Sequence, residues 1–372
     1  MLAGSGLYIH LPWCIKKCPY CDFNSHPING STDFSVYGSC LQQDLAHQLD
    51  LYTGPAFASV FIGGGTPSLC PPEVLANLLK EVPLQSNAEV TMEANPGATE
   101  HHQFADYRAA GINRLSLGAQ SFHPAHLKKL GRIHSPEATL QAYDSARKGG
   151  FDNINLDLMW GLPGQSVDAA LEDLQQALSC APEHLSWYQL TIEPKTEFAA
   201  RPPVLPSDSR IADIERAGLD LLSDAGFDRY EVSAYAKAQH LRCAHNLNYW
   251  RFGDYLGIGA GAHGKHTDTT SRPWRVTRTR HINSPRAYQK DPCAVAHEPV
   301  ANDQLTPEFM MNALRLTDGV AFEAFEANTG QHWKEFNQVW ARLVELGLTR
   351  DDRCATTPLG LRYLDSVVAE FL

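Results

Sequence analysis

The chain of 372 residues is poor in cysteine and in basic residues, and it lacks long apolar runs. Nine cysteines are too sparse for a disulfide scaffold, and an odd number would leave one thiol unpaired. No stretch approaches the roughly 18 uninterrupted apolar residues of a membrane-spanning helix. The first residues also lack the charged and apolar regions of a secretory signal. We therefore expect a cytoplasmic protein.

Basic side chains are outnumbered by acidic ones. The 31 Lys and Arg residues against 42 Asp and Glu residues give a formal net charge of -11. A nucleic-acid groove needs clustered Lys and Arg that displace counterions from the phosphates. The composition therefore argues against nucleic acid as a partner. A homodimer and, at most, peripheral association with a membrane are compatible with it.

The first two thirds of the chain alternate short apolar runs with amphipathic segments, as βα units do. Strands are expected at residues 7–10, 59–62, 89–93, 114–117, 153–158, 186–191 and 229–234. The segments between them follow the helical period; residues 207–226, for instance, have Ser207 as N-cap and Gly226 just past the end. About six repeats predict an α/β fold with a parallel sheet, helices outside, curled into a full or partial barrel. Its functional loops should lie at the carboxyl ends of the strands.

The pattern changes after residue 265. Residues 266–302 are rich in Thr, Arg and Pro and indicate an irregular or β-hairpin connector. Residues 303–372 have helical periodicity and predict a small, mostly helical, winged-helix-like domain. This region has no basic face, so we interpret it as a lid or packing element and not as a DNA-binding module. The expected organisation is therefore a barrel at 1–265, a connector and a C-terminal domain.

Three cysteines, Cys14, Cys18 and Cys21, form a C-x3-C-x2-C pattern directly after the first expected strand. A zinc site usually needs four nitrogen or sulfur ligands, and the sequence has no second C-x2-C pair. Zinc stays an alternative if His10 or His26 supplies the fourth ligand. Three thiolates on a short loop instead suit a [4Fe-4S] cluster, whose fourth iron stays open to bind substrate.

The cysteine pattern, with the aromatic Tyr20 before the last cysteine, resembles the signature of the radical S-adenosylmethionine (SAM) superfamily. In that superfamily SAM chelates the open iron, and an electron from the cluster cleaves SAM to a 5′-deoxyadenosyl radical. The resemblance implies a partial (βα)6 barrel and an electron donor such as a flavodoxin. The cofactors carry this chemistry, and the protein supplies orientation and a dry pocket.

Polar residues and glycines at the ends of the later strands are the candidates for binding SAM. Glycines let a ligand approach the backbone closely, and the Arg132 fork is suited to a carboxylate. Asp157 lies in an apolar run, where a ribose or a cation would explain its charge. Plainer interpretations are a tight turn for the glycines and a surface ion pair for Glu93. The resemblance assigns Glu93 and Tyr8 to SAM, and the candidate set is Tyr8, Gly63, Gly64, Gly65, Thr66, Glu93, Gln120, Arg132 and Asp157.

Along nearly its whole length the chain resembles the oxygen-independent coproporphyrinogen III oxidase branch, through the motifs YIHLPWC, GGGTPS, MEANP, GAQSF, LDLMWGLPGQ, HNLNYW and GIGAGAH. Two functions compete within this branch. One is the oxidase, which makes protoporphyrinogen IX; the other is a haem chaperone, which binds haem and passes it to client haem proteins. Phe23 stands where the oxidase signature has a fourth cysteine, and Cys14 lies almost at the start of the chain, without the oxidase extension. Both differences favour the chaperone.

The motif HNLNYW supplies the candidate haem site. By resemblance, His245 is the axial ligand of the haem iron, and Tyr249 and Trp250 offer flat aromatic surface to the macrocycle. Cys243 is a rival soft ligand. A plainer interpretation is that His245 satisfies backbone groups in a loop. A redox-inert scaffold is a further alternative, and the intact cysteine triad counts against it.

Overall fold

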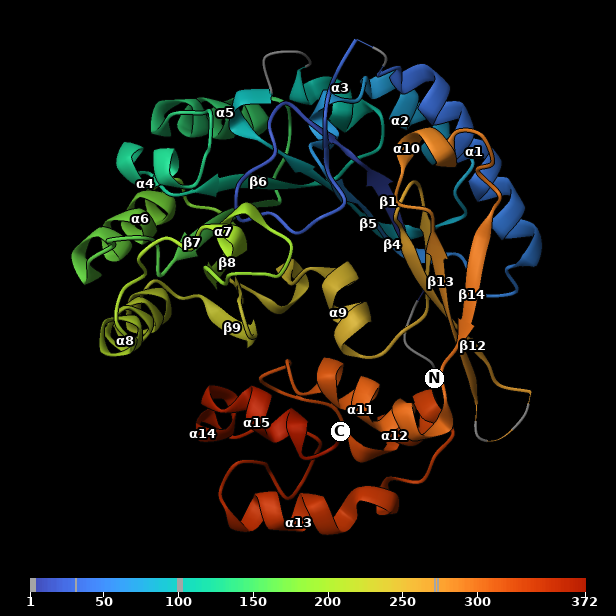
Figure 1. Ribbon diagram of the computed structural model, residues 1–372, viewed down its shortest axis with the longest axis vertical. Helices are drawn as coiled ribbons and strands as arrows, with labels where there is room; N and C mark the ends of the chain where they lie inside the picture. The colour runs from blue at the N-terminus through green and yellow to red at the C-terminus, as the bar shows by residue number, and fades with distance from the viewer. Residues whose placement is uncertain (1–4, 31, 99–102, 271, 273) are drawn as a thin grey trace.

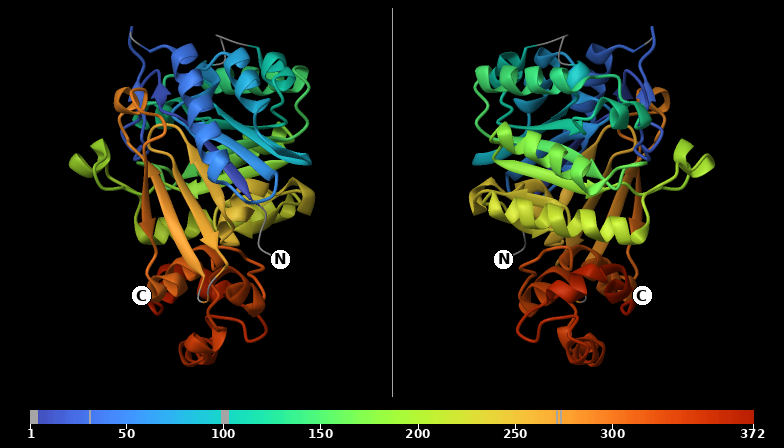
Figure 2. Two further views of the ribbon diagram at one scale, coloured as in Figure 1. Left: turned by 90° about the vertical axis from the view of Figure 1, so that its right-hand side faces the viewer. Right: turned by 90° about the vertical axis from the view of Figure 1, so that its left-hand side faces the viewer.

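The computed structural model describes residues 5–30, 32–98, 103–270, 272 and 274–372. Within them, a curved 12-stranded sheet forms the centre of the molecule, and helices cover its outer side (Figure 1). Views from two sides show the C-terminal helices as a separate layer beneath the sheet (Figure 2).

Six parallel strands form the middle of the sheet. Nearly every residue of the first and fourth of them is buried, because helices cover one face and the barrel interior lies against the other. Their carboxyl ends meet at one edge of the barrel, which confirms the predicted architecture. The strands, in their order of pairing, are β1 (Gly6–Leu11), β4 (Phe57–Gly64), β5 (Leu84–Ala94), β6 (Arg114–Gln120), β7 (Ile154–Trp160) and β8 (His184–Gln189).

Helices connect these strands, and the longer ones follow the outer side of the arc (Figure 1). The helix predicted at 207–226 is present: Ser207 accepts a hydrogen bond from the Arg210 N–H, and Gly226 follows the end with a φ of +78°. The helices are α1 (Phe34–Leu51), α2 (Pro72–Leu79), α3 (Phe104–Ala109), α4 (Pro124–Lys129), α5 (Pro136–Lys148), α6 (Val167–Ser179), α7 (Glu197–Ala200) and α8 (Asp208–Asp224).

The segment expected as a strand at 229–234 is divided into β9 (Asp228–Glu231) and β10 (Ala234–Ala236). The chain reverses between them at Ser233, whose N–H and hydroxyl donate to the Glu231 carboxylate. β10 therefore runs antiparallel to both β8 and β9. The expectation of one continuous strand in a parallel sheet is corrected here.

Beyond β1, four further strands extend the other side of the sheet. β11 pairs parallel to β1, and the three following pairs are antiparallel. The hairpin considered for residues 266–302 is present, but its strands belong to the main sheet. The elements are β11 (Tyr255–Ile258), β12 (His263–Asp268), β13 (Arg275–His281), α10 (Pro285–Tyr288) and β14 (Val295–Pro299), while a separate short pair, β2 (Trp13–Cys14) and β3 (His26–Pro27), flanks the cysteine loop.

The C-terminal region is mostly helical, as predicted, and has an apolar core of its own that includes Phe309, Phe325 and Trp340. The helix α9 (Ala244–Trp250) lies between this region and the barrel (Figure 1). No helix in the described ranges combines the length and apolar character needed to cross a bilayer. The C-terminal helices are α11 (Asn302–Ala313), α12 (Phe322–Thr329), α13 (Asn337–Glu345), α14 (Pro358–Arg362) and α15 (Leu364–Ala369).

A glycine allows α8 to pack closely on the sheet, which predicts a stability effect. A Cβ atom at Gly218 would lie 2.1 Å from Cη2 of the buried Trp187, whose ring stacks on Trp160. Gly218→Ala should therefore lower the free energy of unfolding by about 1–3 kcal/mol, although alanine favours helix by about 1 kcal/mol. Chemical denaturation followed by fluorescence measures this change.

The matched control is Ala212→Gly, on the exposed side of the same helix. This substitution lowers the helix propensity and changes no packing contact. It should lower the free energy of unfolding by about 1 kcal/mol. A Gly218→Ala protein more stable than the parent would contradict the packing explanation.

Candidate functional site

A cavity of about 590 Å³ lies inside the barrel and opens at the cysteine loop. It is lined by all three candidate cluster cysteines, by every SAM candidate except Gly63, and by Tyr249 and Trp250 of the candidate haem motif. Residues from the first 25 positions and from α9 thus border the same space. His245 and Gly63 are not among the described residues that line it.

The cysteine loop begins where β2 ends. Cys14 is buried, Cys18 and Cys21 are half-buried, and none of the three forms a disulfide. The Cys21 N–H donates to the Cys18 carbonyl, and the Lys17 ammonium donates to the Phe23 carbonyl at 2.9 Å, which closes the loop on itself. Free thiols around an enclosed space fit an iron–sulfur cluster, which bonds each thiolate to a different iron.

The structure is less suited to the zinc alternative. The ring nitrogens of His10 are both engaged, by the Tyr8 hydroxyl at 3.0 Å and the Asn24 carbonyl at 2.9 Å. His26 also contacts Asn24, through its Nε2 at 3.1 Å from the side-chain oxygen. His10 therefore has no ring nitrogen left to complete a zinc site.

The glycine-rich turn after β4 packs against the cysteine loop. The Gly65 N–H donates to the Leu11 carbonyl, and the Thr66 N–H donates to the Trp13 carbonyl. A Cβ at Gly65 would lie 2.3 Å from that Trp13 oxygen, so glycine is required for the close approach. These N–H groups are used within the protein. Side chains such as Glu93 are thus the groups that face a ligand.

Glu93 ends β5 beside this turn. It accepts a hydrogen bond from the Gly64 N–H at 3.2 Å. Burial raises the pKa of its carboxyl to about 7, the charge of Asp157 adds to the shift, and the Gly64 N–H opposes it. A Cβ atom at Gly63 would lie 3.2 Å from Cδ of this carboxyl group. A half-buried carboxylate with one hydrogen bond has unused acceptor capacity, which suits an ammonium ligand.

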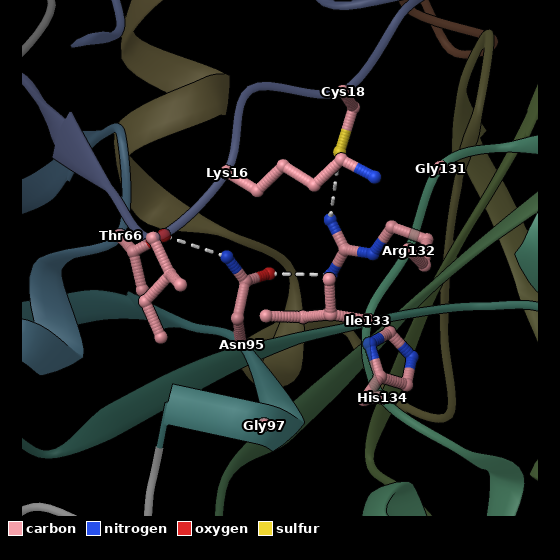
Figure 3. Close-up of a pocket in the computed structure, with 10 residues that line it drawn as sticks. Lys16, Cys18, Thr66, Asn95, Gly97, Gly131, Arg132, Ile133 and His134 are labelled. Carbon is pink, nitrogen blue, oxygen red and sulfur yellow. Dashed lines mark hydrogen bonds between the residues drawn. The ribbon is translucent and has the colours of Figure 1, made fainter. Parts of the chain in front are cut away.

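Arg132 lies between the cysteine loop and the ends of β5 and β6 (Figure 3). One guanidinium nitrogen donates to Cys18 Sγ at 3.7 Å, and the other donates to the Asn95 side chain at 2.6 Å and to the Gly118 carbonyl. Asn95 in turn donates to the Thr66 hydroxyl. Arg132 thus links the cysteine loop to the ends of both strands.

Gln120 ends β6, and Asp157 lies in the middle of the neighbouring strand β7. Gln120 has a φ of +65°, and its side-chain oxygen accepts a hydrogen bond from the Tyr188 hydroxyl at 2.6 Å. Asp157 accepts hydrogen bonds from Ser116 and Asn155 at 2.7 and 2.8 Å. Burial raises the pKa of Asp157, and these hydrogen bonds oppose the shift. Its charge is thus partly balanced by protein groups.

The candidate haem ligand His245 is enclosed. Its Nδ1 lies 3.0 Å from the Ser59 hydroxyl, and its Nε2 lies 2.8 Å from the Tyr249 hydroxyl. Burial lowers the pKa of the imidazole to about 3, so the ring is neutral. Both nitrogens are engaged in this arrangement, and Tyr249 stands between the ring and the cavity.

The rival ligand Cys243 does line the cavity. Its Sγ lies 3.5 Å from the Glu89 carboxylate. Burial raises the pKa of the thiol to about 12, and Glu89 adds to the shift, so the thiol form is favoured. A neutral thiol is a poorer metal ligand than a thiolate.

Several lining residues escaped sequence reasoning. They include Asn95 at the mouth and a polar group on β6, β7 and β8 deeper inside. A polar residue in an otherwise buried strand was the signal that singled out Asp157, and the same signal applies to Arg114, Ser116, Asn155 and His184. Their spacing along the sequence gave no sign that they share one space.

Comparisons with known proteins identify the family of the chain. Residues 8–177 match the model of the radical SAM superfamily, and residues 300–363 match the HemN C-terminal domain. The chain is 49% identical to the heme chaperone HemW of Escherichia coli K12, over 87% of this chain and 86% of that protein. It is 37% identical to the mitochondrial radical S-adenosyl methionine domain-containing protein 1 of Mus musculus, over 89% and 76% of the two chains.

Among solved structures, coproporphyrinogen III oxidase (HemN) of Escherichia coli matches 99% of this chain and 90% of its own, with a TM-score of 0.79. At 20% identity this match shows a common fold. The sequence matches are closer and cover both parts of the chain. The chain therefore belongs to the radical SAM superfamily and, within it, to the family of the heme chaperone HemW proteins.

Proposed function

We propose that this protein is a haem chaperone, which binds a [4Fe-4S] cluster, SAM and haem and delivers the haem to client haem proteins. The observation that carries the proposal is the cavity bordered by the cysteine loop, by the SAM candidates and by the aromatic residues of α9. The identity to proteins named heme chaperone HemW supports it. A cytoplasmic location and an electron donor such as a flavodoxin belong to the same proposal.

Membership of the radical SAM superfamily implies a [4Fe-4S] cluster and SAM. In the proposal, Cys14, Cys18 and Cys21 hold the cluster, which supplies the electron for SAM chemistry when both are bound. Arg132 contacts Cys18 and orients Asn95 at the same time. These contacts give the loop a fixed position before any cofactor arrives.

SAM is placed next to the cluster by side chains at the strand ends. Glu93 takes the ammonium group, because it lines the cavity and has a single hydrogen bond. Tyr8, Gln120 and Asp157 border the adjoining space. Gly64 and its neighbours contribute by keeping the turn close to the loop.

Haem is proposed to lie against Tyr249 and Trp250. His245 is the proposed axial ligand, and the Tyr249 hydroxyl has to leave its Nε2 before the iron can bind there. The neutral state of His245 suits this role. Cys243 is the alternative ligand, at the cost of deprotonating a buried thiol.

Replacing a cluster cysteine should abolish iron binding. Anaerobic reconstitution of the parent protein should give close to four irons per chain, because three thiolates and an external ligand complete a cubane. Cys14→Ala, Cys18→Ala and Cys21→Ala should each lose the iron and its absorption. Cys293→Ala, a thiol outside the cavity, is the control and should keep both. Stoichiometric zinc without iron in protein prepared anaerobically would contradict the assignment.

Glu93→Gln should weaken SAM binding to the reconstituted protein by about ten- to a hundredfold, since it removes one charged contact. The affinity of the parent protein should also fall as the pH drops below about 7, because protonation of Glu93 removes the charge that attracts the ammonium. Calorimetric titration of the protein with SAM measures both effects. A range from about pH 6 to about pH 8 spans one unit on either side of the Glu93 pKa.

The variant itself should lose that pH dependence. Glu73→Gln, on the exposed surface of α2, is the matched control and should bind SAM as the parent does. Equal SAM affinity of Glu93→Gln and the parent at pH 8, about one unit above the pKa, would show that the site is placed wrongly.

His245→Ala should lose or shift the Soret band of bound haem and retain the cluster, because the cysteine loop is built from other elements. His47→Ala, an exposed histidine on α1, is the control and should leave the band unchanged. An unaltered spectrum in His245→Ala would point to Cys243 or another ligand. Formation of protoporphyrinogen IX from coproporphyrinogen III, with SAM and a reductant, would establish the oxidase function instead.

A further inference from the structure

Arg114 is a buried cation at the far end of the cavity from the cluster loop. It begins β6, whereas Gln120 ends the same strand, and six residues of extended chain span about 20 Å. Its side chain is only 2% exposed, yet it lines the cavity. No role in the cluster or SAM site uses this residue.

The guanidinium group of Arg114 has unused donors. In the described part of the chain, neither Nε nor Nη2 has a hydrogen-bond partner. The Glu89 carboxylate lies 3.9 Å from Nε, which is beyond hydrogen-bond distance. A buried polar group without a partner costs free energy, so a guanidinium with unused donors suits an anionic ligand with two oxygens.

The acids around Arg114 are committed elsewhere. Glu89 accepts hydrogen bonds from the N–H groups of Ala244 and His245 at the start of α9. Asp157 accepts from Ser116 and Asn155. These carboxylates balance part of the positive charge and leave the Arg114 donors free.

Arg114 lies apart from the SAM candidates Glu93 and Arg132, while the SAM candidate Asp157 is close enough to interact electrostatically with both Arg114 and Glu93. Glu93 and Arg132 lie at the mouth, next to the cysteine loop. Arg114 instead lies near α9, because Glu89 approaches both the guanidinium and the first residues of that helix. Tyr249 and Trp250 of α9 line the same cavity. An acid bound at Arg114 would therefore belong to a second ligand that stacks on these aromatic rings.

We infer that Arg114 binds a carboxylate of the second ligand, which in the proposed function is a propionate of haem. The inference rests on that function, since it names the residue that recognises the acidic side of the porphyrin. Tyr249 and Trp250 provide apolar contact, and Arg114 provides a paired hydrogen bond to the carboxylate. The bound carboxylate would thereby accept hydrogen bonds from guanidinium donors of Arg114 that have no partner within the protein.

Haem and its dimethyl ester test this inference, because the ester lacks the carboxylate charge. The parent protein, reconstituted anaerobically, should bind haem about ten- to a hundredfold more tightly than the ester. Arg114→Met should lose most of that preference by weakening haem binding alone. Arg132→Met is the matched control, which should weaken SAM binding and keep the preference for free haem.

Removal of one buried charge can unfold the barrel, so the double variant Glu89→Gln/Arg114→Met is measured as well. It removes the cation together with the neighbouring charge, and a glutamine oxygen still accepts from the start of α9. An unchanged haem-to-ester ratio in a folded variant would overturn the inference and leave the proposed function in place. A parent protein that binds no haem would overturn both.

Discussion

The contact of Glu89 with the start of α9 connects the barrel to the helix that borders its interior. The carboxylate accepts hydrogen bonds from the Ala244 and His245 N–H groups, which would otherwise be unpaired at a helix end. It also faces Arg114 and the Cys243 thiol. Glu89 lies on β5 and contacts both the start of α9 and two residues that line the cavity. The position of the aromatic residues of α9 therefore depends on this one carboxylate.

The two ends of the cavity have different electrostatic character. At the mouth, Glu93 is a half-buried acid with spare acceptor capacity, so the site favours a cation. At the floor, Arg114 is a buried base with spare donors, so the site favours an anion. A low-dielectric interior strengthens both preferences. The two ends of the cavity thus favour ligands of opposite charge.

Local patterns in the sequence predicted much of this architecture. The barrel strands are short buried runs between helical segments, and α8 begins and ends with the capping residues Ser207 and Gly226. The prediction of one continuous strand at 229–234 was wrong, because the chain reverses at Ser233, where its N–H donates a hydrogen bond to the Glu231 carboxylate. Residues 266–302 were expected to link domains, but they pair with a sheet edge that only the folded barrel provides.

The sequence by itself determined the family, the spacing of Cys14, Cys18 and Cys21 and the types of residue near the cofactors, because these are properties of short segments. Only the tertiary structure decided which of these polar side chains already have hydrogen-bond partners within the protein and which can still bind a ligand. His245 is enclosed by Ser59, which is distant in the chain, whereas Arg114 is buried without a full set of partners. Whether a side chain is free to bind a ligand depends on contacts between residues that are distant in the sequence. The spacing of residues along the chain does not predict those contacts.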